Sequence, residues 1–244
     1  MRMQTFARVA ATRRTNVKPQ FAGHVTDLIL PEPDGGDRSQ AFLVEQTANW
    51  TLPTHFHLEH QFQVFVAGGG KLGRHPIAPL TVHYASPHSA YGPLVSGAEG
   101  IAYLTLRAVS DTGAWYLPES RAKLQTHIPK RQEHGAPGAY VNAAQLTALP
   151  GPVTEILIEP DASGLAAWVV RLPPGCTAAA PAQDAPAGGR FHIITQGALR
   201  IGGEECAALA AAFAAYGENV MLEAGDAGAE VIVVQYPAAA LRPL

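Results

Sequence analysis

The sequence predicts an all-β protein made of two similar modules. Charged residues are only 15% of the 244-residue chain, whereas glycine (24) and proline (20) are abundant. This balance favours short strands joined by tight turns over long amphipathic helices. Short apolar runs follow one another at intervals of roughly ten residues and stop at glycine or proline, which is typical of a β-sandwich or barrel.

An internal similarity indicates that one β module occurs twice. Phe62 and Gly68 align with Phe191 and Gly197, and the apolar positions between them also agree. The offset is 129 residues (191 minus 62), which is about half of the chain. We therefore expect a mobile basic N-terminal arm over residues 1–20, a first barrel over 21–127, a linker over 128–150 and a second barrel over 151–244.

The individual strands are expected where apolar runs meet turn residues. The alanine run 207–215 has the propensity of a helix, but its place in a series of strands favours a strand over 211–216. Residues 118–125 are the expected short helix, with proline at its start. The expected strands are 40–47, 61–66, 80–84, 101–106, 154–158, 166–172, 191–194, 198–201, 211–216 and 230–235.

Bulk properties exclude several classes of partner. The formal net charge of −3 gives no reason to expect nucleic acid. Two cysteines, Cys176 and Cys206, are too few for a disulfide scaffold. No apolar run approaches the ~18 residues of a membrane span. The arginine-rich start is similar to a targeting peptide but lacks the apolar core of a secretory signal. A cytoplasmic protein without nucleic-acid or membrane partners is expected.

A histidine cluster in the first half indicates a metal site. Of the ten histidines, six lie between His55 and His88. In a strand, residues i and i+2 point to the same face, so His55 and His57 can direct two imidazoles at one point. Neutral imidazoles bind divalent transition metals well. His60 has the opposite parity and His75 follows the glycine turn, so both are expected on the surface.

The stretch around this pair resembles the first motif of the cupin superfamily, G-x5-H-x-H-x3,4-E-x6-G. His55, His57 and Gly68 match the motif, Gln61 stands at the glutamate, and Asn49 stands at the first glycine. The second motif, G-x5-P-x-G-x2-H-x3-N, retains only its histidine, which is His88 here.

The resemblance implies two tandem jelly-roll barrels, a bicupin, with one divalent transition metal in the first barrel. Its ligands would be His55, His57 and His88, with Gln61 close by. Fe(II) is favoured, and Zn, Ni or Mn are alternatives. A homodimer is a further expectation from the family. His83, which lies within an expected strand, competes with His88 as the third ligand and is otherwise a contact to the substrate.

Gln61 is the departure that bears most on function. A neutral amide in place of a carboxylate leaves the cation its full charge, which weakens metal affinity and attracts anionic ligands. The arrangement resembles the three-histidine site of thiol dioxygenases in the same superfamily. The alternative is that Gln61 marks a site that no longer has a catalytic function. If Gln61 faces inward, alternation places Gln63 and Phe65 inward too. Tyr91 and Tyr103 are further candidates for the cavity wall. For all four residues, ordinary barrel packing is favoured over a specific role.

The second half lacks metal-ligating residues at the matching places. Asp184 and Pro186 correspond to His55 and His57, and Arg190 corresponds to Gln61. We expect a degenerate second barrel without metal.

The leading functional hypothesis is a dioxygenase-like oxidation of a small anionic organic molecule, with catalytic residues unassigned. The alternatives are a non-catalytic cupin that binds a small ligand for sensing or storage, and a metal-assisted isomerase or lyase. Whether the protein is an enzyme stays open at this stage.

Overall fold

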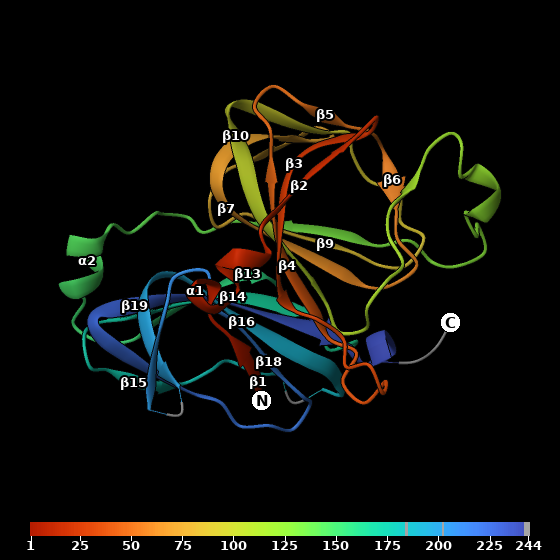
Figure 1. The fold of residues 1–244 in the computed structure, drawn as a ribbon. Coiled ribbons are helices and arrows are strands. Elements are labelled where there is room, and N and C mark those ends of the chain that lie inside the picture. The colour runs from red at the N-terminus through yellow and green to blue at the C-terminus, as the bar shows by residue number, and fades with distance from the viewer. Residues whose placement is uncertain (184, 202, 242–244) are drawn as a thin grey trace. The chain divides into compact units, whose positions relative to one another are not determined.

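The computed structural model describes residues 1–183, 185–201 and 203–241. It contains two compact units (Figure 1). The first unit is Ala10–His134, and the second unit is Met1–Val9 together with Gly135–Leu244. Asp184, the expected counterpart of His55, lies outside the described residues.

The first unit is built almost entirely of strands. Its elements are η1 (Ala10–Thr12), β2 (Arg14–Lys18), β3 (Phe21–Ile29), β4 (Gln40–Gln46), β5 (Thr51–Leu52), β6 (His55–Phe56), β7 (Gln61–Leu72), β8 (His75–Ile77), β9 (Val82–Ala85), β10 (Leu94–Arg107), β11 (Trp115–Tyr116), η2 (Arg121–Lys123) and β12 (Gln132–Gly135).

The second unit has the same character. Its elements are β1 (Arg2–Gln4), α1 (Phe6–Val9), α2 (Ala143–Thr147), β13 (Val153–Ile158), β14 (Ala166–Leu172), β15 (Thr177–Ala179), β16 (Ala187–Ile201), β17 (Glu204–Ala207), β18 (Ala211–Ala214), β19 (Met221–Pro237) and η3 (Ala238–Leu241). None of the helices in the described part of the chain is long and apolar enough to cross a membrane.

The two units share one sheet topology. The order in the first unit is β12-β9-β7-β10-β4-β3-β2, with β5 on β10 and β8 on β7. The order in the second unit is β1-β18-β16-β19-β14-β13, with β15 on β19 and β17 on β16. The internal similarity of the sequence therefore falls on equivalent strands, β7 and β16. The all-β class is confirmed, but neither sheet closes into a barrel among the described strands.

The basic start of the chain is strand rather than a separate arm. β1 pairs with β18 from Arg2 to Gln4, and β2 pairs with β3. Basic side chains also form ion pairs across these strands, as Arg14 of β2 does with Asp27 of β3 at 2.5 Å. Backbone pairing orders the segment, a feature that its charge composition does not reveal.

Two further regions differ in detail from the expectation, and a third agrees with it. The expected linker 128–150 contains β12 and α2, and α2 begins with a capping box between Asn142 and Gln145. The expected helix over 118–125 is reduced to the 3-10 turn η2. The alanine run forms the strand β18, as its place in the series predicted.

Two glycines at matching places in the two units have backbone conformations that require glycine. Gly68 and Gly197 both have φ of +69°. A Cβ at Gly68 would lie 2.1 Å from the carbonyl oxygen of Gly100, and one at Gly197 would lie 2.0 Å from that of Gly228. Both positions thus require a left-handed backbone and a close approach of the neighbouring strand.

We expect Gly197→Ala to lower the free energy of unfolding by about 2–4 kcal/mol, because it adds a backbone clash to the left-handed penalty. Chemical denaturation measures this loss. Gly217→Ala is the matched control, since Gly217 has φ of +85° but nothing within 4 Å of its added Cβ. That control should cost only about 1–2 kcal/mol. If the two variants lost the same free energy of unfolding, the predicted backbone clash at residue 197 would be wrong.

A buried histidine in the second unit makes stability depend on pH. Burial, assisted by the nearby charge of Arg190, lowers the pKa of His192 to about 3. The unfolded chain has an ordinary histidine pKa near 6.5, so between these values it binds a proton that the folded chain does not. The free energy of unfolding should therefore fall by up to about 1.4 kcal/mol per pH unit as the pH drops from 6.5 toward 3.

His192→Leu should remove this contribution. As the pH is lowered from 7.5 to 5, the melting temperature of the variant should rise relative to that of the parent. Thermal unfolding at several pH values tests this prediction. Substitution of the exposed His127 by glutamine is the control. Parallel pH profiles for His192→Leu and the parent would contradict the prediction.

Candidate ligand-binding cavity

The first unit encloses a cavity of about 310 Å³. Its walls come from β2, β3, β4, β7 and β10, and the segment 111–116 contributes the remaining side. Six of the residues singled out in the sequence line it: His55, His57, Gln61, Gln63, Tyr91 and Tyr103.

A buried arginine organises one end of this cavity. Arg107 is 3% exposed and lies opposite Gln40 in the pairing of β10 with β4. Its Nε and Nη2 donate to the side-chain oxygen of Gln61 at 3.0 and 2.6 Å, and its Nη1 donates to that of Gln40 at 2.7 Å. The oxygen of Gln61, which the sequence offered as a metal ligand, is therefore engaged by a guanidinium group.

The contacts of Gln61 set the direction of a hydrogen-bond chain. Because its oxygen accepts from Arg107, its nitrogen donates to the Tyr91 hydroxyl, at 2.6 Å. His55 Nδ1 lies 2.8 Å from the carbonyl oxygen of Pro53, which can only accept, so Nδ1 carries the proton. His55 Nε2 then accepts from the Tyr91 hydroxyl at 3.1 Å. The lone pair that a metal would need from His55 is thus directed at Tyr91.

His57 is oriented by a carboxylate. Its Nδ1 lies 2.8 Å from Asp111 Oδ2, which also accepts from the backbone N–H of Leu58 at 3.3 Å. Nδ1 therefore carries the proton, and Nε2 is the lone-pair nitrogen. Arg107 Nη2 also lies 3.2 Å from Nδ1, a contact that is electrostatically unfavourable once Nδ1 is protonated.

Burial keeps both imidazoles neutral. It lowers the pKa of His55 to about 3, with a further contribution from His57. It also lowers the pKa of His57 to about 4, with a further lowering by the charge of Arg107 and an opposing effect of Asp111. Burial by itself would raise the pKa of Asp111, but the hydrogen bond from His57 and the charge of Arg107 hold it below its usual range. The contact between His57 and Asp111 is thus a hydrogen bond from a neutral ring to a carboxylate.

The other expected ligands lie elsewhere. The ring of His88 stacks on Phe56 with centroids 5.6 Å apart, and its backbone N–H donates to the carbonyl of His57 at 2.8 Å. His83 Nδ1 bonds the side-chain oxygen of Gln63 at 2.9 Å. His83 therefore lies behind the cavity wall, where it orients the amide of Gln63.

The expected set of metal ligands does not fit this arrangement. No three His, Cys, Asp or Glu side chains within the described ranges are placed to hold a metal ion. Sites with a resident transition metal usually have three or four protein ligands. Of the four expected ligands, His88 is not among the residues that line the cavity, and the oxygen of Gln61 is engaged by the guanidinium of Arg107.

Three other residues singled out in the sequence have packing roles. Phe65 belongs to the hydrophobic core and contacts Tyr103 with ring centroids 5.2 Å apart. His60, which was expected on the surface, is half-buried, and its Nδ1 lies 2.6 Å from the Tyr84 hydroxyl. His75 is half-buried and stacks on His134 at 3.9 Å between centroids.

Sequence reasoning missed Arg107 and Asp111. Arg107 could have been found, because it shares the parity of Tyr103 along the strand that was expected to end at 106. Asp111 lies in an irregular segment with no motif around it. Its role depends on a hydrogen bond to a residue 54 positions earlier, and no local pattern reports such a contact.

Comparison with known proteins shows the fold. No protein-family model matches the chain, and no curated protein sequence matches it. A variant of Bacillus subtilis oxalate decarboxylase is similar in structure, with a TM-score of 0.62 and 12% identity over 97% of this chain and 77% of that chain. The formate complex of Lactobacillus farciminis oxalate decarboxylase has a TM-score of 0.60 and 10% identity, over 97% and 86% of the two chains.

These similarities establish an all-β fold of the kind seen in oxalate decarboxylases, which are cupin proteins. The Bacillus subtilis enzyme contains Mn(II) centres. At 10–12% identity, the comparison concerns the fold and not the activity of this chain.

Proposed function

We propose that this chain is a bicupin whose first unit binds a small organic anion, with a carboxylate held at Arg107. The observation that best supports this proposal is the net charge of the cavity lining. Its cations are Arg14, Lys18 and Arg107, and its carboxylates are Asp27 and Asp111. With the two histidines neutral, three cations less two carboxylates leave one net positive charge, which favours an anionic ligand.

The form of Arg107 suits a carboxylate. A guanidinium group is planar and carries several donors, so it can bind a carboxylate together with neighbouring amides. The hydrogen bonds to Gln40 and Gln61 hold the group in one orientation before a ligand arrives, which reduces the entropy cost of binding. The Lactobacillus farciminis enzyme binds formate, itself a carboxylate, in a similar fold.

Isothermal titration calorimetry with a panel of small carboxylates and their neutral amides tests the proposal. We expect carboxylates to bind and to raise the melting temperature, because a ligand at 100 times its Kd adds about 2.7 kcal/mol to the free energy of unfolding. The amides should bind at least about tenfold more weakly, since they carry no charge. Equal binding of acids and amides, or no binding of any acid, would overturn the proposal.

Dioxygenase-like oxidation with a divalent metal, with Fe(II) favoured, is the second candidate function. One observation favours it, namely that the neutral rings of His55 and His57 lie side by side at the cavity, with centroids 5.3 Å apart. Metal analysis of protein reconstituted with Fe(II), Mn(II), Zn(II) or Ni(II) tests it. A content below about a tenth of an equivalent of every metal would reject it.

Oxygen uptake with thiols, β-dicarbonyls and catechols then separates the catalytic hypotheses. Oxygen consumption supports the oxidation, whereas turnover under anaerobic conditions supports an isomerase or lyase. Ligand binding that survives His57→Ala, without turnover, supports a protein that only binds its ligand. The homodimer remains an expectation, which size-exclusion chromatography with light scattering can test.

A further inference from the structure

The cavity has a polar end and an apolar end, and the register of three strands explains the gradient. Arg107 of β10 lies opposite Gln40 of β4. Two residues further along each strand, Thr105 lies opposite Phe42. Two residues beyond that, the row consists of Tyr103 on β10, Val44 on β4 and Val25 on β3.

On β10 and β4, successive rows therefore pass from charged through mixed to apolar on one face, while the outer strand β2 adds the exposed cations Arg14 and Lys18 at the edge of the apolar rows. Residues two apart share a face, so these rows all point into the same space. At about 3.4 Å per residue, the first and third rows are roughly 14 Å apart.

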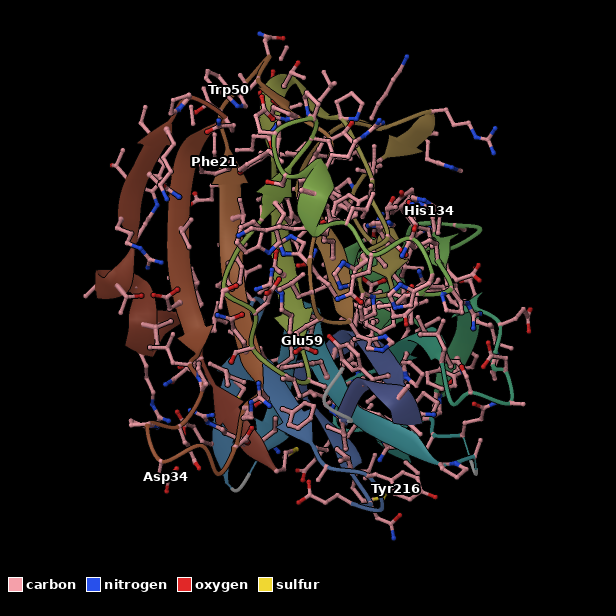
Figure 2. All side chains as sticks on the ribbon, turned by 90° about the vertical axis from the view of Figure 1, so that its right-hand side faces the viewer. Phe21, Asp34, Trp50, Glu59, His134 and Tyr216 are labelled. Carbon is pink, nitrogen blue, oxygen red and sulfur yellow. The ribbon has the colours of Figure 1, made fainter. Side chains whose placement is uncertain are left out.

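The apolar end is part of a larger hydrophobic cluster. Phe21, Val25, Val44, Leu52 and Tyr103 all line the cavity and belong to this one cluster. Figure 2 shows Phe21 toward one end of the strands and Glu59 toward the other. The charge of Arg107 acts on the pKa of Glu59, so Glu59 marks the polar end.

The volume limits the size of the ligand. A water molecule takes up about 30 Å³ in the liquid, so a cavity of about 310 Å³ has room for a ligand of about ten non-hydrogen atoms. A two-carbon dianion such as oxalate would leave much of that space unfilled. Of the cations beside the apolar end, Arg14 and Lys18 lie at exposed positions of β2, and Arg14 pairs with Asp27 at 2.5 Å. A second carboxylate buried among Phe42, Val44 and Tyr103 would therefore lie in an apolar environment, where an unpaired charge is strongly disfavoured.

We infer that the ligand of this cavity is an amphipathic monocarboxylate of about ten non-hydrogen atoms. Its carboxylate lies at Arg107, and its aromatic or branched aliphatic body lies between Phe42, Val44 and Tyr103. This inference rests on the proposed anion binding and names the class of ligand. It distinguishes the cavity from one that takes the small dianion oxalate.

Calorimetry with acetate, oxalate, phenylacetate and phenylacetamide tests the inference on the full-length protein. Burial of a phenyl ring should make phenylacetate bind at least about 30-fold more tightly than acetate. Oxalate should bind no better than acetate. Phenylacetamide, which has the same apolar body without the charge, should bind at least about tenfold more weakly than phenylacetate.

Val44→Thr should separate the apolar end from the carboxylate site. Thermal unfolding first establishes that the variant is folded, and Val25→Thr, in the same apolar row, replaces it if it is not. Either variant should weaken phenylacetate about 3- to 10-fold and leave acetate unchanged, because only phenylacetate reaches that end. Val153→Thr, at a solvent-exposed position of β13, is the matched control and should change neither affinity.

Different results would reject the amphipathic monocarboxylate and the proposed anion binding. Equal affinities for acetate, oxalate and phenylacetate would overturn the inference and leave the proposed anion binding intact. Binding of phenylacetamide as tight as that of phenylacetate, or no binding of any acid, would overturn both.

Discussion

Replacement of Arg107 by methionine is expected to weaken carboxylate binding by at least about 100-fold. Hydrogen bonds to charged groups contribute about 1.5–3 kcal/mol each, and the variant loses such a bond together with the positive charge. The lining charge would also fall from +1 to zero, with two cations and two carboxylates remaining. Methionine keeps much of the length of the side chain, so the contact with the ring of Phe42, now 5.5 Å from the guanidinium carbon, is largely retained.

Two further variants establish that the loss reflects the guanidinium group. Arg107→Lys keeps the charge but not the planar fork, so an intermediate loss of about tenfold is expected. Arg200→Met is the matched control, because Arg200 is exposed in the second unit and pairs with Asp226 at 2.8 Å. Calorimetry with phenylacetate measures all three affinities. Binding of Arg107→Met within about threefold of the parent would be incompatible with a carboxylate at this position.

A loss of about 3–5 kcal/mol in the free energy of unfolding is expected for Glu230→Leu. Glu230 and Arg171 are 3% and 4% exposed, and Arg171 Nε donates to Glu230 at 2.8 Å. Arg171 also bonds Glu155 at 3.1 Å and the carbonyl of Ala139 at 2.9 Å. Removal of Glu230 leaves the buried guanidinium with one carboxylate that is itself partly exposed to water.

A double-mutant cycle isolates the energy of this pair. Arg171→Met combined with Glu230→Leu should recover a large part of the loss, because no unpaired charge remains buried. Glu223→Leu is the matched control on the same strand, since its pair with Arg200 at 3.7 Å is half exposed. It should cost no more than about 0.5 kcal/mol. Additive effects of the two core substitutions in chemical denaturation would show that the pair is not coupled.

The all-β class, the repeated module and the inward direction of His55 and His57 followed from the sequence. Each depends on local properties, namely the alternation of side chains along a strand and the turn chemistry of glycine. The same alternation correctly placed Gln61 and Gln63 on the cavity wall. It also turned Phe65 inward, where its ring packs on Tyr103 in the hydrophobic core instead of lining the cavity.

Only the tertiary structure decided what Gln61 does. From the sequence it could tune a metal or mark a retired site. In the structure its oxygen accepts two hydrogen bonds from Arg107, which lies 46 residues away in the chain. His88 matches a spacing in the sequence, yet its ring stacks on Phe56 rather than facing the cavity. Local periodicity decides which face of a strand a side chain occupies, whereas the partner it meets there depends on which distant strand is paired beside it.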